Sequence, residues 1–284
     1  MSVQVRMPTF LIVGAMRSGT SSLVHYLRRH PDIFISQPKE LHFFDHHYER
    51  GVDWYEQQFS GAQGKVQVGE ATPNYMYDRV AVDRMVHLLP DVKLIAILRN
   101  PVARAYSHYW HNRSRGKESL DFVEALQAEP ARLALSAESA TTFSYADRGR
   151  YDRQLRYLLD RFPRQALKVL LFEDLESDPD DVVTEACGHL NLAPLPNTFA
   201  GVVVNEYTEF RSLTLRRLAK RLPSPMARLA AGINVRRGRG YIPLSPDIRR
   251  RLELLYRDEI ELASELTGRD LAKIWFQTQC SKEA

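Results

Sequence analysis

Near its N-terminus the chain reads Phe10-Leu11-Ile12-Val13-Gly14-Ala15-Met16-Arg17-Ser18-Gly19-Thr20-Ser21-Ser22-Leu23. The apolar run Phe10–Val13 predicts a buried strand, and a helical pattern that begins at Ser21 continues toward Arg29. Between them lies a loop of small and hydroxyl-bearing residues. Glycines let backbone N–H groups approach a ligand, and the positive end of the helix dipole favours negative charge. The segment therefore predicts an anion-binding loop.

The place of the basic residue decides what kind of anion suits this loop. In the ATP-binding pattern GxxxxGK[ST], a lysine directly follows the second glycine. Thr20 stands at that place here, and the basic residue, Arg17, precedes Gly19 by two positions. The loop is suited to a phosphate-like group, bound in a different way from the triphosphate of ATP. An ordinary strand-to-helix turn is the alternative interpretation.

A second segment, Pro38-Lys39-Glu40-Leu41-His42-Phe43-Phe44-Asp45, places ionisable side chains among aromatic ones. Aromatic neighbours exclude water, and burial can raise the pKa of a carboxyl group toward neutrality, where it can act as a general base. A carboxyl group of this segment, Glu40 or Asp45, could therefore have a raised pKa and act as a general base. A metal site formed with His46 and His47 is the alternative. Adjacent histidines usually point in different directions, so we expect no metal here.

A third segment, Val92–Leu98, is apolar except at Lys93, as in a strand that is covered on both faces of a parallel sheet. Arg99, Asn100 and Pro101 follow, and proline suits the first turn of a helix. Arg99 is therefore expected at the carboxyl end of a strand, where ligands bind in open α/β sheets. A surface arginine with a helix-capping role is the alternative.

In this order and spacing, the three segments resemble the motifs of sulfotransferases that use 3′-phosphoadenosine 5′-phosphosulfate (PAPS), especially the heparan sulfate (glycosaminoglycan-type) and bacterial members. The resemblance implies an α/β fold of the P-loop NTPase-like type, with a central parallel sheet flanked by helices. It assigns Glu40 as general base, with His42 and Asp45 beside it in the acceptor site. It also implies that one loop binds the donor's 5′-phosphosulfate, through Arg17, Ser18, Gly19, Thr20, Ser21 and Ser22.

The resemblance also suggests residues for the 3′-phosphate of the donor. Arg99 and Ser107, about two helical turns after Pro101, correspond to the residues that hold this phosphate in the family. A loop rich in arginine and glycine resembles the one that closes over it, and Arg237, Gly238 and Arg239 fall at the matching places. A nucleic-acid-binding patch is the competing interpretation, for which one short arginine loop is weak evidence.

Two further residues are candidates of lower specificity. Phe210 is expected to stack on the adenine of the donor. His111 ends a Ser-x-Tyr-x-His run like that of N-sulfotransferases, where the histidine is implicated in the chemistry, although a packed histidine is an equal alternative. The sequence departs from the family in having Arg17 in place of lysine and Ala71 in place of a substrate-contacting lysine. The second departure argues against a heparan-like polyanionic acceptor.

Composition and pattern predict one domain over residues 1–284. The chain has 26% charged and 44% hydrophobic residues and a net charge of +4, which is ordinary for a globular enzyme. Strands are expected at 9–14, 66–69, 92–98 and 167–172. Helices are expected near 20–30, 78–88, 101–114, 119–128, 151–161, 179–190 and 246–267. Strand and helix alternate, which favours a parallel sheet. Residues 112–148 and 211–234 are expected to be variable, acceptor-facing segments.

Partners and location are predicted from composition. The two cysteines form no motif and no signal-peptide core is visible, so we expect a cytoplasmic protein. No nucleic-acid partner is expected. The basic segment 211–234 could contact a membrane or an acidic carrier protein, or could be a solvated helix face.

The function expected from these observations is in-line transfer of a sulfonyl group from PAPS to a hydroxyl or amine, which leaves 3′-phosphoadenosine 5′-phosphate (PAP). The acceptor could be a carbohydrate, a lipid or a natural product, and Arg17, Glu40, His42 and His111 are the catalytic candidates. A small-molecule kinase is one alternative, but its ATP-binding pattern requires a lysine at the position that Thr20 occupies here. A non-catalytic anion-binding protein of the same fold is the other.

Overall fold

The computed structural model describes residues 7–195, 199, 209–210, 235–236 and 242–277. By residue number the chain divides into two compact units. The first comprises 1–101, 150–202 and 255–284, and the second comprises 102–149 and 203–254. Segment 211–234 and the predicted phosphate ligands Arg237, Gly238 and Arg239 lie outside the described residues, as does the side chain of Phe210. The expectation of a single domain stays a prediction.

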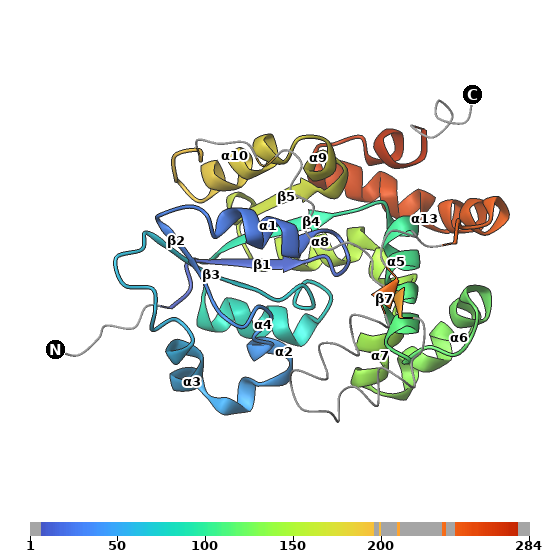
Figure 1. Ribbon diagram of the computed structural model, residues 1–284, viewed down its shortest axis with the longest axis horizontal. Coiled ribbons are helices and arrows are strands. Elements are labelled where there is room, and N and C mark those ends of the chain that lie inside the picture. The colour runs from blue at the N-terminus through green and yellow to red at the C-terminus, as the bar shows by residue number, and fades with distance from the viewer. Residues whose placement is uncertain (1–6, 196–198, 200–208, 211–234, 237–241, 278–284) are drawn as a thin grey trace. The chain divides into compact units, whose positions relative to one another are not determined.

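The first unit is built on a five-stranded parallel sheet with the strand order β2-β3-β1-β4-β5 (Figure 1). Its strands are β1 (Phe10–Gly14), β2 (Ile33–Ile35), β3 (Gln67–Ala71), β4 (Lys93–Leu98) and β5 (Leu167–Leu171). β1 lies in the middle, and all of its residues are buried. A continuous apolar run is what a strand covered on both faces requires. The expected α/β fold with a central parallel sheet is confirmed.

The register places the ends of three strands level with one another. Ile12 of β1 lies opposite Ala71 of β3 and Ile95 of β4. Because the strands are parallel, the loops that follow them leave the same edge of the sheet. The loop after β1, the turn after β3 and Arg99 after β4 therefore share one edge.

Helices of the first unit connect and cover these strands. They are α1 (Thr20–Leu27), α2 (Phe43–His46), α3 (Val52–Gln57), α4 (Arg79–Leu88), α8 (Tyr151–Leu159), α9 (Phe172–Ser177) and α10 (Pro179–His189). Short turns are η1 (Tyr48–Arg50), η3 (Arg164–Ala166) and η4 (Lys273–Gln277). α1 packs on α10 and α2 packs on α4, and Figure 1 shows α9 and α10 beside β5. Asp78 and Asp178 cap α4 and α10 by accepting hydrogen bonds from backbone N–H groups.

The second unit is mainly helical. Its elements are α5 (Pro101–Ser114, of which Pro101 counts with the first unit), α6 (Phe122–Leu135), α7 (Ala137–Phe143), η2 (Asp147–Gly149) and the antiparallel pair β6 (Glu209–Phe210) and β7 (Val235–Arg236). The long helix α13 (Pro246–Thr267) is shared by residue number between the units. Asp121 and Glu124 form a reciprocal capping box at the start of α6. α6 packs against α7.

The predicted elements agree with the structure to within a few residues, with informative exceptions. Strand β2 and helices α2, α3, α7 and α9 were not predicted, because each has seven residues or fewer and carries little periodicity. The helix expected at 119–128 runs instead from Phe122 to Leu135 and contains Pro130. Among the described residues, no helix is long and apolar enough to cross a bilayer.

Candidate active site

The loop after β1 is held by the neighbouring strand. The backbone N–H of Ala15 donates to the carbonyl oxygen of Ile97 on β4 at 2.8 Å, and the N–H of Met76 donates to Val13 at 2.9 Å. Arg17 has φ 69°, in the left-handed region that residues other than glycine rarely adopt. Such a backbone persists only where the surroundings impose it, and it is frequent at ligand-binding sites.

Gly19 is required at the start of α1 for two separate reasons. Its φ is 90°, which glycine adopts without penalty. A Cβ atom at this position would also lie 2.7 Å from Cδ2 of Phe172 and 3.3 Å from Leu175, both on α9. No side chain caps α1, and the positive end of a helix dipole suits an anion.

The side chain of Ser18 has an unusual environment. The residue is fully buried, and its hydroxyl has no hydrogen-bond partner among the described residues. A buried hydroxyl without a partner costs free energy. Together with the N-terminus of α1, this hydroxyl fits the loop to an oxyanion, which would supply the missing partner.

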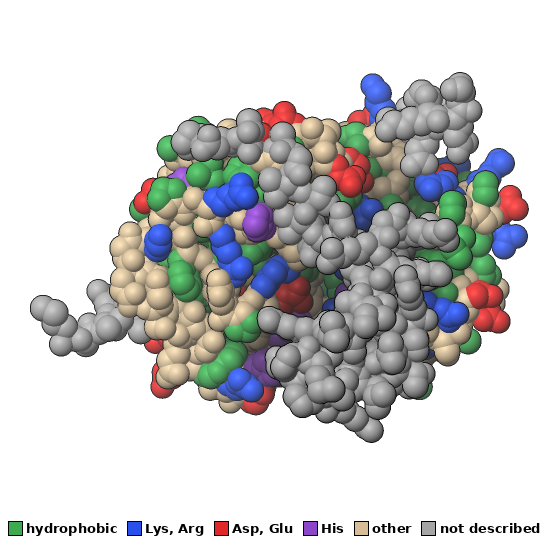
Figure 2. Space-filling model, viewed as in Figure 1, with side chains coloured by type: hydrophobic (Ala, Val, Ile, Leu, Met, Phe, Trp, Pro, Cys, Tyr) green, Lys and Arg blue, Asp and Glu red, His purple; other side chains and the backbone are tan. Residues whose placement is uncertain are grey.

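Arg99 lies beside the loop at the end of β4. Its guanidinium donates to the carbonyl oxygen of Arg17 at 3.2 Å and lies 4.3 Å from the centre of the Phe172 ring. The hydroxyl of Tyr151 donates to the carbonyl oxygen of Arg99 at 2.8 Å. The structure thus brings the guanidinium of Arg99 to the backbone of Arg17. Figure 2 shows basic side chains gathered with histidine and acidic side chains on the face that carries α1.

The residue after Arg99 is fixed by the C-terminal part of the chain. The backbone N–H of Asn100 donates to Glu173 at 2.9 Å, and its side-chain amide donates to the carbonyl oxygen of Trp275 at 2.7 Å. The indole N–H of Trp275 donates to the same Glu173 carboxylate at 2.9 Å. The turn that positions Arg99 is therefore rigid.

The predicted acceptor segment forms a compact cluster of charges. Nδ1 of His42 lies 2.9 Å from Oδ2 of Asp45, and Nε2 lies 3.6 Å from Oε2 of Glu40. Lys39 donates to the other Glu40 oxygen at 2.7 Å. Asn74 donates to Asp45 at 2.7 Å. The structure brings Glu40, His42 and Asp45 together, and their roles in an acceptor site stay predictions.

The charges of this cluster shift the pKa of each member. Burial alone would raise the pKa of Glu40, but the ion pair with His42 and the charge of Lys39 outweigh burial and lower the pKa to about 2. The expectation of a raised pKa for Glu40 is therefore wrong, because its cationic neighbours dominate its aromatic ones. Burial would lower the pKa of His42, yet bonds to Asp45 and Glu40 raise it to about 9. Despite burial, His42 and Asn74 keep the pKa of Asp45 below its usual value.

The backbone of this segment is as unusual as its charges. Glu40 has φ 67° and His42 has φ 53°. With Arg17 and Asn191 they are the four non-glycine residues of positive φ in the described part of the chain. Three of these four residues belong to the two predicted binding segments. The backbone N–H of Glu40 donates to the carbonyl oxygen of Ala71 at 3.1 Å, which attaches the segment to the end of β3.

His42, Asp45 and His46 also have the spacing of metal ligands. One donor atom from each residue lies within 4.8 Å of the others. A metal would need a lone pair on the imidazole, and Nδ1 of His42 is engaged with Asp45 at 2.9 Å. Asp45 already accepts hydrogen bonds from His42 and Asn74. The cluster is therefore better described as a hydrogen-bonded ion network.

A model of the sulfotransferase domain matches residues 7–216. The chain belongs to the sulfotransferase family. The expected family and class of enzyme are confirmed, and the matched range includes the loop at Arg17.

Known sulfotransferases resemble this chain over most of its length. Human bifunctional heparan sulfate N-deacetylase/N-sulfotransferase 3 is 29% identical over 274 residues, which cover 92% of this chain and 30% of that protein. Human heparan sulfate glucosamine 3-O-sulfotransferase 6 is 36% identical over 174 residues, 61% of this chain and 49% of that protein. The chain thus spans less than half the length of these curated relatives. A crystal structure of a sulfotransferase from Alicyclobacillus acidocaldarius has a TM-score of 0.73 at 30% identity and covers 95% of this chain and 99% of that one.

The remaining predicted residues of the sulfotransferase lie in the second unit. Ser107 is buried on α5, and His111 is half-buried on the same helix. Their roles stay predictions, as do those of Phe210 and the loop Arg237–Arg239. Sequence reasoning did not assign roles to Phe172, Asn74 or Glu70, whose importance appears only when the chain is folded.

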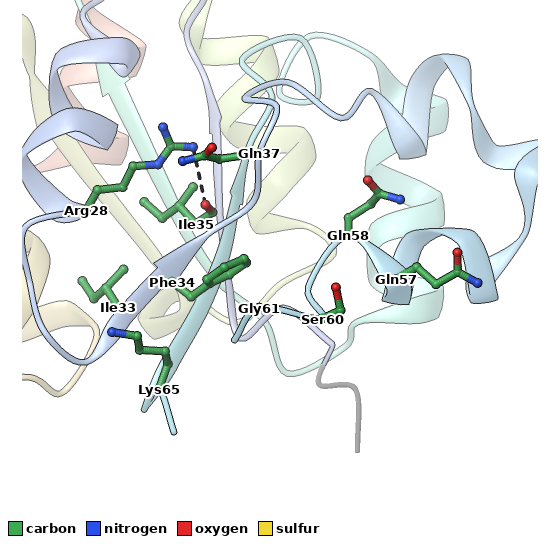
Figure 3. Close-up of a pocket in the computed structure, with 10 residues that line it drawn as sticks. All are labelled: Arg28, Ile33, Phe34, Ile35, Gln37, Gln57, Gln58, Ser60, Gly61 and Lys65. Carbon is green, nitrogen blue, oxygen red and sulfur yellow. Dashed lines mark hydrogen bonds between the residues drawn. The ribbon is translucent and has the colours of Figure 1, made fainter. Parts of the chain in front are cut away.

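A separate pocket opens at the β2 edge of the sheet (Figure 3). It has a volume of about 540 Å³. Its lining includes the edge-strand residue Phe34, the basic side chains of Arg28 and Lys65, and the amides of Gln37 and Gln57. None of the predicted donor or acceptor residues lines it. We therefore do not place the sulfotransferase reaction there.

Proposed function

We propose that this sulfotransferase moves a sulfonyl group from PAPS to a hydroxyl or amine of a carbohydrate. The observation that carries the proposal is the shared carboxyl edge of β1, β3 and β4. Arg17 and Arg99 lie together at this edge, and the ionised Glu40 is attached to it through Ala71. The names of the relatives, which act on heparan sulfate, support a carbohydrate acceptor.

The donor-binding residues have the chemistry that PAPS requires. Arg17, the hydroxyl of Ser18 and the N–H groups at the start of α1 bind the 5′-phosphosulfate. Arg99 binds the 3′-phosphate, and Phe172 and Tyr151 hold its guanidinium and carbonyl in place. Hydrogen-bond donors that are fixed in this way stabilise the charge that builds up on the sulfonyl group and on the leaving phosphate.

The reaction is a direct displacement at sulfur. The acceptor atom forms a bond to sulfur while the bond from sulfur to the 5′-phosphate oxygen breaks, and PAP leaves. The acceptor's proton passes to the Glu40 carboxylate. In the free protein Lys39 and His42 make Glu40 a weak base. An acceptor hydroxyl that takes the place of Lys39 at Oε1 raises the pKa of Glu40 and makes it a better base where it is needed.

The acceptor is proposed to be less anionic than heparan sulfate. The family's substrate-contacting lysine is replaced here by Ala71, which is fully buried at the end of β3. A cation that would attract a sulfated chain is therefore absent from this position.

Isothermal titration of the protein with PAP, adenosine 5′-monophosphate and ATP tests the donor site. We expect PAP to bind most tightly. The Arg99→Ala variant should weaken PAP binding by ~10–100-fold, as expected for the loss of a charged hydrogen bond, and adenosine 5′-monophosphate binding much less. The matched control Arg161→Ala removes a half-buried arginine that is paired with Asp83 and should leave all three affinities unchanged.

Transfer of label from [³⁵S]PAPS to neutral and to sulfated oligosaccharides tests the reaction. Label on the neutral acceptor supports the proposal, and label on the sulfated one alone contradicts the acceptor class. Preferred binding of ATP, or equal PAP affinity of the wild type and Arg99→Ala, would overturn the donor assignment.

A further inference from the structure

Glu70 is a carboxylate that the proposed reaction does not use. It lies on β3 and is fully buried. Its oxygens accept hydrogen bonds from three hydroxyl groups. Thr72 donates to Oε1 at 2.8 Å, Tyr75 donates to the same oxygen at 2.5 Å, and Tyr55 donates to Oε2. A buried carboxylate is tolerated only when such donors satisfy it.

The direction of each hydrogen bond is fixed by chemistry. The backbone N–H groups of Phe43 and Phe44 donate to the Tyr75 hydroxyl at 2.8 and 3.3 Å, and the N–H of His42 donates to Thr72 at 3.4 Å. A backbone N–H can only donate, so each hydroxyl accepts there and has its own proton left for another acceptor. That acceptor is Glu70.

The segment at the other end of these bonds is the acceptor segment of the site. Glu40 and His42 hold left-handed backbone conformations, which cost about 1–3 kcal/mol each unless the surroundings impose them. Helix α2 has no side-chain cap from its N-cap residue, His42. The Tyr75 hydroxyl serves instead, because it accepts from the first two N–H groups of α2.

We propose that Glu70 is a positioning residue that, through Tyr75 and Thr72, holds the backbone from Glu40 to Phe44 in the conformation required for transfer. The proposal rests on the assignment of Glu40 as the base. Glu70 is not a catalytic residue itself, because it has no exposed surface and its oxygens already accept the three hydroxyl protons.

Two tyrosine variants provide a matched test. Tyr75→Phe and Tyr55→Phe each remove one hydroxyl from the same carboxylate and keep the aromatic ring, and for Tyr55 that ring stacks on Phe43. Of the two tyrosine hydroxyls, only that of Tyr75 also binds the backbone of the acceptor segment. We expect Tyr75→Phe to lower kcat by ~10–100-fold with the KM for PAPS unchanged, since it removes an interaction that acts on the chemical step.

The control and a third variant complete the kinetic test. Tyr55→Phe should keep kcat within about two-fold of the wild type, even where its thermal stability falls as far as that of Tyr75→Phe. Glu70→Gln should lower kcat at least as much as Tyr75→Phe, because an amide nitrogen cannot accept a hydroxyl proton. Equal loss of kcat in the two tyrosine variants would show that Glu70 supports only the fold and would overturn the proposal.

An NMR titration of His42 supplies a readout that does not depend on sulfonyl transfer. The charged groups near His42 are Glu40, Asp45 and Lys39, and the His46 ring lies 5.1 Å from the His42 ring. In Tyr75→Phe the pKa of His42 should fall from about 9 toward its ordinary value. In Tyr55→Phe it should stay at about 9, because only the first variant loosens the pairing of His42 with Glu40 and Asp45. If the titration behaves so while no acceptor is sulfated, the positioning role stands and the proposed reaction fails. An unchanged His42 titration in Tyr75→Phe overturns the positioning role.

Discussion

The guanidinium of Arg99 lies 4.3 Å from the centre of the Phe172 ring. The same ring fills the space in which a side chain at Gly19 would have to lie. Phe172, the first residue of α9, therefore sets both the path of the anion-binding loop and the position of the cation beside it. The two halves of the proposed donor site are coupled through one aromatic side chain.

Gly19→Ala should weaken donor binding. The new methyl group meets Phe172 at 2.7 Å and the backbone has φ 90°, so the loop must move at a cost of about 1–3 kcal/mol. Calorimetry should show a rise in the Kd for PAP of ~5–150-fold. Gly51→Ala is the matched control, because Gly51 has φ 80° with nothing within 4 Å of the added atom. Equal PAP affinity in the two variants would exclude the role given to Phe172.

Glu40→Gln should abolish most of the turnover and leave the donor site intact. An amide has nearly the shape of the carboxylate but cannot take the acceptor's proton, so kcat should fall by ~10²–10⁴-fold. The Kd for PAP should not change. Glu49→Gln, at an exposed position on η1, is the control and should keep full turnover. Near-normal kcat in Glu40→Gln would remove this residue from the role of base.

Lys39→Met should shift the pH dependence of kcat/KM. The ammonium of Lys39 lies 2.7 Å from Glu40 and contributes to the low pKa of that carboxyl. Without the cation the pKa of Glu40 rises. As the solution is acidified, Glu40 then becomes protonated at a higher pH than in the wild type. The acid limb of the profile should therefore move toward neutrality. An acid limb at the wild-type pH would mean that another group controls it.

His42→Asn should remove a pH-dependent part of the stability. The pKa of His42 is about 9 in the folded protein against an ordinary value of 6.5. A raised pKa stabilises the fold fully below pH 6.5, and this contribution is lost as pH rises through 9. Wild-type protein should lose about 1–2 kcal/mol in urea unfolding across this window, after allowance for solvent screening.

The variant should show little loss over the same pH range, since asparagine tolerates the left-handed backbone of position 42. His87→Asn, on the exposed side of α4, is the control and should retain the wild-type slope. A variant as pH-sensitive as the wild type would assign the effect to other groups.

Local motifs made much of the site predictable from the sequence. The loop from Gly14 to Ser22 and the position of Arg99 follow from short patterns that join a buried strand to a helix. The hydrophobic pattern also gives the parallel sheet, because a buried parallel strand is apolar throughout. The three-residue strand β2 is too short for any periodicity and was missed.

Electrostatics were less predictable than position. Lys39 and His42 are neighbours of Glu40 in the sequence, but only the fold turns both toward its carboxylate. The aromatic residues around it suggested a raised pKa, and the paired charges produce the reverse. Glu70 carries a signal in the sequence, because it is a carboxylate within a strand whose adjacent residues are small and buried. Its hydroxyl partners come from α3 and from the turn after β3, and the sequence alone does not pair them.

The non-glycine residues with positive φ mark positions at which the backbone conformation lowers the stability of the fold. At the end of α10, outside the proposed site, the position of positive φ is occupied by Asn191, a residue type that adopts this conformation readily. Within the site the same conformation is forced on arginine, glutamate and histidine. Glycine or asparagine at Arg17, Glu40 or His42 would relieve the backbone strain but remove the charged side chain. Engineering for heat resistance should therefore leave these three positions alone and look for its gains elsewhere in the chain.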